Sequence, residues 1–269
     1  MHRSGTRLLA QVLNRLGVFM GADQQADSES VTFMMLNELI LHQCGAFWSE
    51  PMAAHFVLAE PQIVEQVAAS IVEVLDGQLQ NYLGASGFRP EPSAARPFGW
   101  KDPRNTFTLP VWRQIFPELR VIHILRHGVD AAASLSRRHA EALRSAAGES
   151  HPSALTVIRD HALGVLSSRR GWTLAEALTM WEQYVEKARL QLAELEGRGI
   201  EVRFEDLLQT PEPVVAKIAA FCRLPEPASG PELLEHLSPG RAFAFKRDPE
   251  LVAFAEASRA ALDRYGYSP

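Results

Sequence analysis

Cysteine is scarce in this sequence, because Cys44 and Cys222 are the only two among 269 residues. They lie far apart and neither belongs to a Cys-X-X-Cys motif, which excludes a disulfide framework and a cysteine-based zinc site. This cysteine usage is typical of a reducing compartment, so we expect a cytoplasmic protein. Three of the histidines, His139, His151 and His161, are too scattered to form a metal site, and we expect no bound metal.

Long hydrophobic runs and a basic charge balance are missing as well. Although 46% of the residues are hydrophobic, no apolar run is long enough to span a bilayer, and no leader precedes the first motif. The 27 Lys and Arg are outnumbered by 32 Asp and Glu, which argues against general nucleic-acid binding. The length suits a single domain over residues 1–269 with one sizeable core, and the composition does not indicate an oligomeric state.

Strand-like and helix-like segments alternate along the chain. We predict strands at 98–101, 120–125 and 199–204, and helices at 4–16, 31–41, 61–83, 106–116, 131–143, 173–196 and 211–221. This alternation predicts an α/β domain in which a central parallel sheet is flanked by helices. Residues 144–170 are polar and loosely patterned, and we interpret them as a lid or cap region within the domain.

Polar residues follow each predicted strand, namely Lys101-Asp102, Arg126 and Glu205-Asp206. In parallel sheets, ligands bind at the carboxyl ends of the strands. We therefore expect these three strand ends to converge on one site.

The first seven residues, MHRSGTR, read as a short turn that runs into a helix. Gly5 lets the backbone approach a ligand closely, Ser4 and Thr6 supply hydroxyls, and Arg3 and Arg7 supply cations. A helix N-terminus with these groups suits a phosphate or a sulfate. The alternative is an ordinary helix capped by a hydroxyl, because the first Gly and the Lys of a full phosphate-binding loop are absent.

Arg126 follows the most apolar strand directly, and Asp130 and Ser134 come four and eight residues later. A strand-end arginine and a hydroxyl on the next helix can hold one phosphate from two sides. Alternatively, Arg126 pairs with a nearby carboxylate and Ser134 is a small packing residue. The pair alone does not decide between these interpretations.

Three motifs in this order resemble the sulfotransferases that use 3′-phosphoadenosine 5′-phosphosulfate (PAPS), and more narrowly their bacterial and Golgi-like branch. They are the N-terminal loop, the segment Lys101-Asp102-Pro103-Arg104, and the strand that runs into Arg126. The segment 204–208 before Pro211 is similar to the closing strand and helix of that family. The resemblance covers nearly the whole chain and implies a P-loop NTPase-like fold that apparently lacks its first strand. We therefore expect the native chain to begin upstream of Met1.

The resemblance also implies roles for individual residues. The loop from Arg3 to Arg7 would bind the 5′-phosphosulfate, and Arg126 and Ser134 would bind the 3′-phosphate. Lys101 would lie near the bridging oxygen and, with Arg3, would stabilise charge on the leaving group. The reaction would move a sulfuryl group in line to a hydroxyl or amine of a small-molecule, lipid or glycan acceptor, without a metal.

The general base is the least defined role. Cytosolic relatives have a histidine two residues after the lysine, where this chain has Pro103. Golgi-type relatives use a glutamate after the loop helix, for which Glu29 is our candidate and Asp23 the alternative; for both, the other interpretation is a solvated loop charge. Asp102 is a third candidate that we interpret rather as a helix cap.

Two further basic segments are compatible with anion binding. Relatives carry a late basic segment that reaches the 3′-phosphate, to which Lys246 and Arg247 correspond. Four arginines could attract an anionic acceptor in the lid region, namely Arg137, Arg138, Arg169 and Arg170, although such basic pairs are more often a solvated face.

Two other functions remain open from the sequence. A P-loop kinase or NTPase needs a loop lysine and a strand-end aspartate for Mg²⁺. The chain has Arg3 and Arg126 at these places, which disfavours that function. A non-catalytic sulfotransferase-like binding protein is the second alternative.

Overall fold

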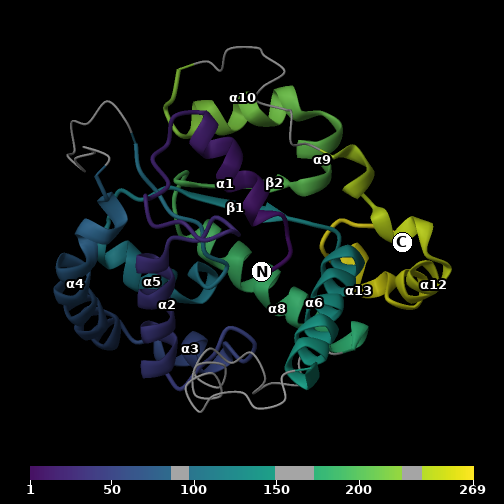
Figure 1. Cartoon of the computed structure of the whole chain (residues 1–269), viewed down its shortest axis with the longest axis horizontal. Coiled ribbons are helices and arrows are strands. Elements are labelled where there is room, and N and C mark those ends of the chain that lie inside the picture. The colour runs from purple at the N-terminus through teal and green to yellow at the C-terminus, as the bar shows by residue number, and fades with distance from the viewer. Residues whose placement is uncertain (86–96, 149–172, 226–237) are drawn as a thin grey trace.

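A small parallel sheet lies at the centre of the computed structural model, with helices on both sides (Figure 1). The structure describes residues 1–85, 97–148, 173–225 and 238–269. Strand β1 (Val121–Leu125) pairs in parallel with β2 (Gly199–Arg203), with His123 opposite Glu201 at the middle of the register. The predicted α/β class, a parallel sheet flanked by helices, is confirmed.

One face of the sheet is covered by three helices: α1 (Thr6–Arg15), α9 (Phe204–Gln209) and α10 (Pro211–Phe221) (Figure 1). Apolar residues at helical spacing in α1 meet alternate residues of both strands in one buried cluster. Its buried members are Leu8, Leu9, Val12, Ile124, Val202, Phe204, Leu207, Leu208, Val215 and Ile218. This cluster anchors the N-terminal loop to the ends of the strands.

The other face carries α6 (Gly128–Gly148) and α8 (Leu174–Ala193), with α5 (Asn105–Ile115) packed against α8. Beyond α5 lie α2 (Val31–Gln43), α3 (Met52–Val57) and α4 (Pro61–Leu83) (Figure 1). The chain ends in two short 3₁₀ turns, η1 (Pro239–Arg241) and η2 (Ala244–Arg247), and two helices, α12 (Pro249–Ala257) and α13 (Arg259–Arg264). The larger core is built on aromatic residues, among them Phe33, Trp112, Trp181 and Tyr184.

Several predicted boundaries were wrong. Residues 98–101 form no strand and make a single parallel bridge, Phe19 with Phe98. The reason is that Trp100 turns into the core, where its indole stacks on Phe33 at 3.9 Å and donates to Asn105 Oδ1 at 3.1 Å. Helix α6 is longer than the predicted 131–143, and residues 144–148 of the predicted lid continue it. The rest of the predicted lid, 149–170, lies outside the described residues.

No helix in the described part of the chain combines the length and the apolar character needed to cross a membrane.

Candidate active site

The N-terminal loop reaches α1 through two residues with left-handed backbone. Arg3 has φ 68°, and Gly5, the residue that caps α1, has φ 93°. A Cβ on Gly5 would lie 2.2 Å from Cδ2 of Phe204. The close approach predicted for a ligand at Gly5 is therefore made by this aromatic ring, and glycine is required by both the backbone and the neighbour.

Side-chain capping of α1 was the simpler interpretation of the loop, and it is wrong. The N-cap residue of α1 is Gly5, and the described residues show no side-chain capping bond there, so neither Ser4 nor Thr6 acts as the cap. Ser4 is buried, Thr6 is half-buried, and Arg7 is exposed. The first-turn N–H groups are thus not satisfied by a capping side chain, as an anion site at this helix end requires.

Arg3, Arg126 and Ser134, which the sequence analysis assigned to PAPS, line one cavity of about 250 Å³. Among the described residues its lining is completed by Arg137, Arg138, Glu141, Arg241, Ala244 and Arg247. Six arginines therefore face a single carboxylate. We call this the arginine cavity; Ser4, Gly5, Thr6 and Arg7 of the loop are not part of its lining.

Arg126 and Ser134 form the buried floor of the arginine cavity, with 5% and 8% of their surface exposed. Arg126 donates to the Arg3 carbonyl at 3.1 Å, and Arg3 Nε donates to Ser134 Oγ at 2.9 Å. Arg126 also lies 3.7 Å from the carboxylate of Asp130, so the pairing weighed as an alternative exists alongside the cavity. Its buried Nε has no hydrogen-bond partner among the described residues, and burial lowers the pKa of this arginine.

Phe204 supports the cationic floor and was not singled out by the sequence. Its ring lies 4.9 Å from the guanidinium carbon of Arg126 and 5.7 Å from that of Arg241. Such cation–π contacts stabilise arginines without neutralising them. The sequence marks Phe204 only as an apolar residue at the end of a strand.

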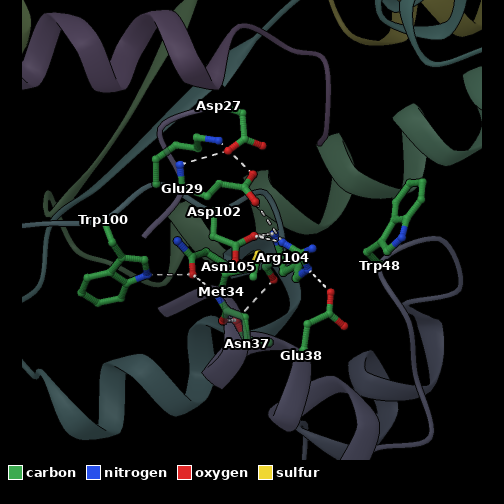
Figure 2. Close-up of polar contacts among 12 residues, drawn as sticks. Asp27, Glu29, Met34, Asn37, Glu38, Trp48, Trp100, Asp102, Arg104 and Asn105 are labelled. Carbon is green, nitrogen blue, oxygen red and sulfur yellow. Dashed lines mark hydrogen bonds and ion pairs between the residues drawn. The ribbon is translucent and has the colours of Figure 1, made fainter. Parts of the chain in front are cut away.

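A second polar cluster contains Lys101 and Glu29, the other two assigned residues. Lys101 Nζ lies 2.8 Å from Glu29 Oε1, and Arg104 lies 3.3 Å from Glu29 Oε2. Arg104 also pairs with Asp102 at 2.9 Å and with Glu38 at 2.5 Å (Figure 2). We call these five residues the Arg104 cluster. Glu29 is only 4% exposed, so its interpretation as a solvated loop charge was wrong.

Burial and pairing compete in the Arg104 cluster. Burial by itself lowers the pKa of Arg104, but its three carboxylate partners together raise that pKa above the usual value. Burial raises the pKa of Glu29, and the charge of Asp102 adds to the effect, despite Lys101 and Arg104. Burial likewise raises the pKa of Glu38. In Glu29 and Glu38, burial outweighs pairing with the two bases, so both carboxylates are more basic than free ones.

Asn37 fixes the far side of this cluster. Its amide nitrogen donates to Asp102 Oδ2 at 2.9 Å and to Asn105 Oδ1 at 2.8 Å (Figure 2). Its amide oxygen accepts from Thr108 at 2.5 Å and from the Trp112 indole at 2.8 Å. Sequence reasoning missed Asn37, although one fully buried amide within an apolar helix is a usable signal.

Arg104 and Glu38 were missed as well. Arg104 belongs to the segment that starts at Lys101, but no role was predicted for it. Glu38 lies on α2, far from Arg104 in sequence. The prediction that Asp102 caps the helix was wrong, because α5 begins at Asn105 and its N-cap residue is Arg104, without a side-chain cap. Asp102 Oδ1 instead accepts the Arg104 N–H at 2.8 Å in the turn before the helix.

Two other candidate carboxylates, Asp23 and Glu205, form hydrogen bonds outside the cavity lining. Asp23 accepts from Ser30 Oγ at 3.0 Å and from the Thr32 N–H at 2.7 Å, which ties it to the start of α2. Glu205 accepts from the His127 N–H at 2.9 Å and the Tyr267 hydroxyl at 2.8 Å, and it is absent from the cavity lining. The third strand end thus does not join the site as predicted.

His2 lies close enough to the arginine cavity and to the Arg104 cluster for charges from both to affect its pKa. Its ring is buried and packs edge-on against Trp48 at 4.8 Å. Burial lowers the pKa of His2, and the charges of Arg104, Arg138 and Lys101 lower it further. The arginine cavity and the Arg104 cluster therefore act on one residue, which directly precedes Arg3 in the loop.

A family model described as the sulfotransferase family matches residues 1–228 of the 269 in the chain. The chain therefore belongs to the sulfotransferase family, which indicates a transferase of sulfuryl groups. No curated protein and no solved structure matches the chain.

Proposed function

We propose that the protein transfers a sulfuryl group from PAPS to a hydroxyl or amine of a small-molecule, lipid or glycan acceptor. The observation that carries this proposal is the arginine cavity, which offers six guanidinium groups and one carboxylate beside the start of α1. PAPS has a 3′-phosphate, a 5′-phosphate and a sulfate. Planar guanidinium groups bind such oxyanions through paired N–H donors.

Arg126 and Ser134 are assigned to the 3′-phosphate, which distinguishes PAPS from ATP. The support is their burial at the floor of the cavity and the unpartnered Nε of Arg126. Arg3 bridges to Ser134 and begins the loop that leads into α1, so we assign the loop from Arg3 to Arg7 to the 5′-phosphosulfate. In this arrangement the N–H groups of Ser4, Gly5 and Thr6 complement the side chain of Arg3.

Lys101 and Glu29 are assigned to the transfer step. The acceptor oxygen or nitrogen bonds to sulfur while the bond from sulfur to the bridging oxygen breaks, and the electron pair leaves with 3′-phosphoadenosine 5′-phosphate (PAP). Lys101 offsets the charge on that oxygen, and Glu29 takes the acceptor proton. The raised pKa of Glu29 suits a base, and its contact with Arg104 fixes the carboxylate.

Calorimetric titration with PAP in the absence of Mg²⁺ tests the donor assignment. We expect the wild-type protein to bind PAP, Arg126→Ala to lose most of the affinity, and ATP to bind weakly with or without Mg²⁺. ATP binding that requires Mg²⁺ and survives Arg126→Ala would instead favour a P-loop NTPase. No PAP binding by the folded wild type would contradict the donor assignment.

A transfer assay tests the base. The enzyme would be incubated with PAPS and a panel of alcohols, phenols, amines and sugars, and PAP release would be measured by anion-exchange chromatography. Glu29→Gln should lower the turnover rate by roughly 10²- to 10⁴-fold and leave PAP binding intact. Asp23→Asn is the matched control and should retain turnover; the reverse pattern would transfer the role to Asp23.

A further inference from the structure

Asp130, on the first turn of α6, connects two parts of the chain that lie far apart in sequence. Its carboxylate is 3% exposed and accepts the backbone N–H of Ala244 at 3.0 Å and of Phe245 at 2.8 Å. These two amides belong to residues 241–247, which we call the C-terminal strap. One buried side chain thus satisfies two consecutive amides of the strap.

The same carboxylate also lies close to a residue of the arginine cavity, although Asp130 itself is absent from the lining. Asp130 Oδ2 lies 3.7 Å from Arg126, and the strap contributes Arg241, Ala244 and Arg247 to the cavity lining. Asp130 therefore holds two walls of the cavity at once, the strand end and the strap.

The strap reaches Asp130 in a conformation that needs external support. Phe243 has a left-handed backbone with φ 49°, a region that is costly for an aromatic residue. Phe245 is buried and stacks on His127 with 4.3 Å between ring centroids. In this docked position, Arg241 approaches Arg126 over the shared ring of Phe204, and the two like charges repel.

We propose that Asp130 is a positioning residue that docks the strap on the arginine cavity, so that docking and occupancy by a phosphate-bearing ligand stabilise each other. A bound phosphate screens the repulsion between Arg126 and the arginines of the strap, while Asp130 supplies the fixed negative charge and the amide acceptors. The two effects act on the same docked state, and by linkage each must strengthen the other. Only the identity of the ligand rests on the proposed function.

Hydrogen–deuterium exchange of the strap, read by mass spectrometry on the full chain, tests docking directly. In the wild type, PAP should slow exchange of the strap amides. Asp130→Asn keeps the shape but removes the charge and one acceptor, so strap exchange should be about tenfold faster and the Kd for PAP about tenfold higher. Asp248→Asn is the matched control, because Asp248 also accepts two consecutive amides, at 3.0 and 3.4 Å, yet is not among the cavity lining. It should change neither quantity.

Several outcomes separate this inference from the proposed function. If inorganic phosphate slows strap exchange in the wild type but PAP does not bind, the linkage stands and the PAPS assignment fails. If PAP binds and neither the ligand nor Asp130→Asn changes strap exchange, the inference is overturned while the proposed function survives. Should Asp130→Asn fail to fold, the wild-type comparison with and without ligand still tests the linkage, because a strap that docks independently of cavity occupancy would show no ligand-dependent protection.

Discussion

The Arg104 cluster and the arginine cavity are built from the same kinds of residue and reach opposite charge balances. Arg104 and Lys101 are buried among three carboxylates, which satisfy them. In the cavity, Arg126 is equally buried, but its paired carboxylate, that of Asp130, lies 3.7 Å away and is not part of the cavity lining. The pKa of Arg104 is raised by its carboxylates, whereas burial lowers the pKa of Arg126.

This difference shows how one fold separates scaffold from binding surface. A cation that is fully paired inside the protein has little interaction left for a ligand, and its removal exposes buried partners. A cation that is desolvated and underpaired raises the energy of the free protein and recovers it when an anion binds. We therefore expect mutation of Arg104, which pairs with three carboxylates, to act on stability, and mutations in the arginine cavity to act on affinity.

The largest effect on stability is expected of Arg104→Ala. It removes the base that the buried carboxylates of Glu29, Glu38 and Asp102 share and leaves Lys101 as the remaining base of the cluster, so we expect a loss of about 3–5 kcal/mol in the free energy of unfolding. Urea denaturation followed by circular dichroism measures it. Arg104→Lys should recover part of the loss, because a lysine keeps the charge but not the planar fork. A loss below about 1 kcal/mol would mean that the cluster is not a buried scaffold.

Gly5→Ala tests the contact of the N-terminal loop with Phe204, the ring that packs on two arginines of the cavity. The new Cβ would meet Phe204 at 2.2 Å with φ at 93°, so steric overlap and backbone strain add. We expect a loss of about 2–4 kcal/mol in unfolding free energy, read from thermal melts. Because the Phe204 ring makes cation–π contacts with both Arg126 and Arg241, its displacement should lower PAP affinity as well.

Gly17→Ala is the matched control for Gly5→Ala. Gly17 also has positive φ, at 96°, but within the described part of the chain nothing apart from its two sequence neighbours lies within 4 Å of an added Cβ. Equal losses in the two variants would show that the backbone alone, and not Phe204, requires glycine in the loop.

Glu201 offers a reference carboxylate outside both regions. Burial by itself raises its pKa, but hydrogen bonds from His123 and Arg189 outweigh burial and lower the pKa to about 2. A folded pKa below the unfolded value of about 4.3 contributes stability above that pH, and the contribution is lost as the pH falls toward 2. This direction is opposite to that of Glu29, whose pKa is raised.

Glu201→Gln should therefore cost about 1–3 kcal/mol at neutral pH, and the difference from the wild type should shrink between about pH 4.5 and 2. Urea denaturation across this pH range measures it. Glu212→Gln, at an exposed position on α10, should leave the profile unchanged. A difference that grows on acidification would reverse the sign and contradict the pairing of Glu201 with His123 and Arg189.

The sequence predicted the parts of this molecule that depend on local pattern. The strands at Val121–Leu125 and Gly199–Arg203 follow from apolar runs, and α4 and α10 have the predicted bounds because proline starts each helix. Arg126 and Ser134 could be considered together because Ser134 comes eight residues after the strand-end arginine, on the helix that follows the strand. Spacing of this kind survives folding, so the three main cavity residues were named in advance.

Contacts between distant segments could not be predicted in the same way. No local pattern brings Glu29 and Glu38 to Arg104, which lies at least 66 residues away from either. The loop around Glu29 is polar, and polar loops are usually solvated, so its burial depends entirely on the partner that covers it. The strand predicted at 98–101 was wrong for a related reason, because the packing of Trp100 on Phe33 overrides the strand pattern.

The smallest effect, and the sharpest contrast with Arg104→Ala, is expected of Arg138→Ala. Arg138 is exposed on α6 at the rim of the arginine cavity, and after burial its charge is the largest influence that lowers the pKa of Arg3. Its removal should change the unfolding free energy by less than about 0.5 kcal/mol. PAP affinity should fall about three- to tenfold at low salt, and less near 0.5 M salt, where exposed charges are screened. Calorimetry at two salt concentrations measures this; a stability loss like that of Arg104→Ala would mean that the cavity rim, too, is internally paired scaffold.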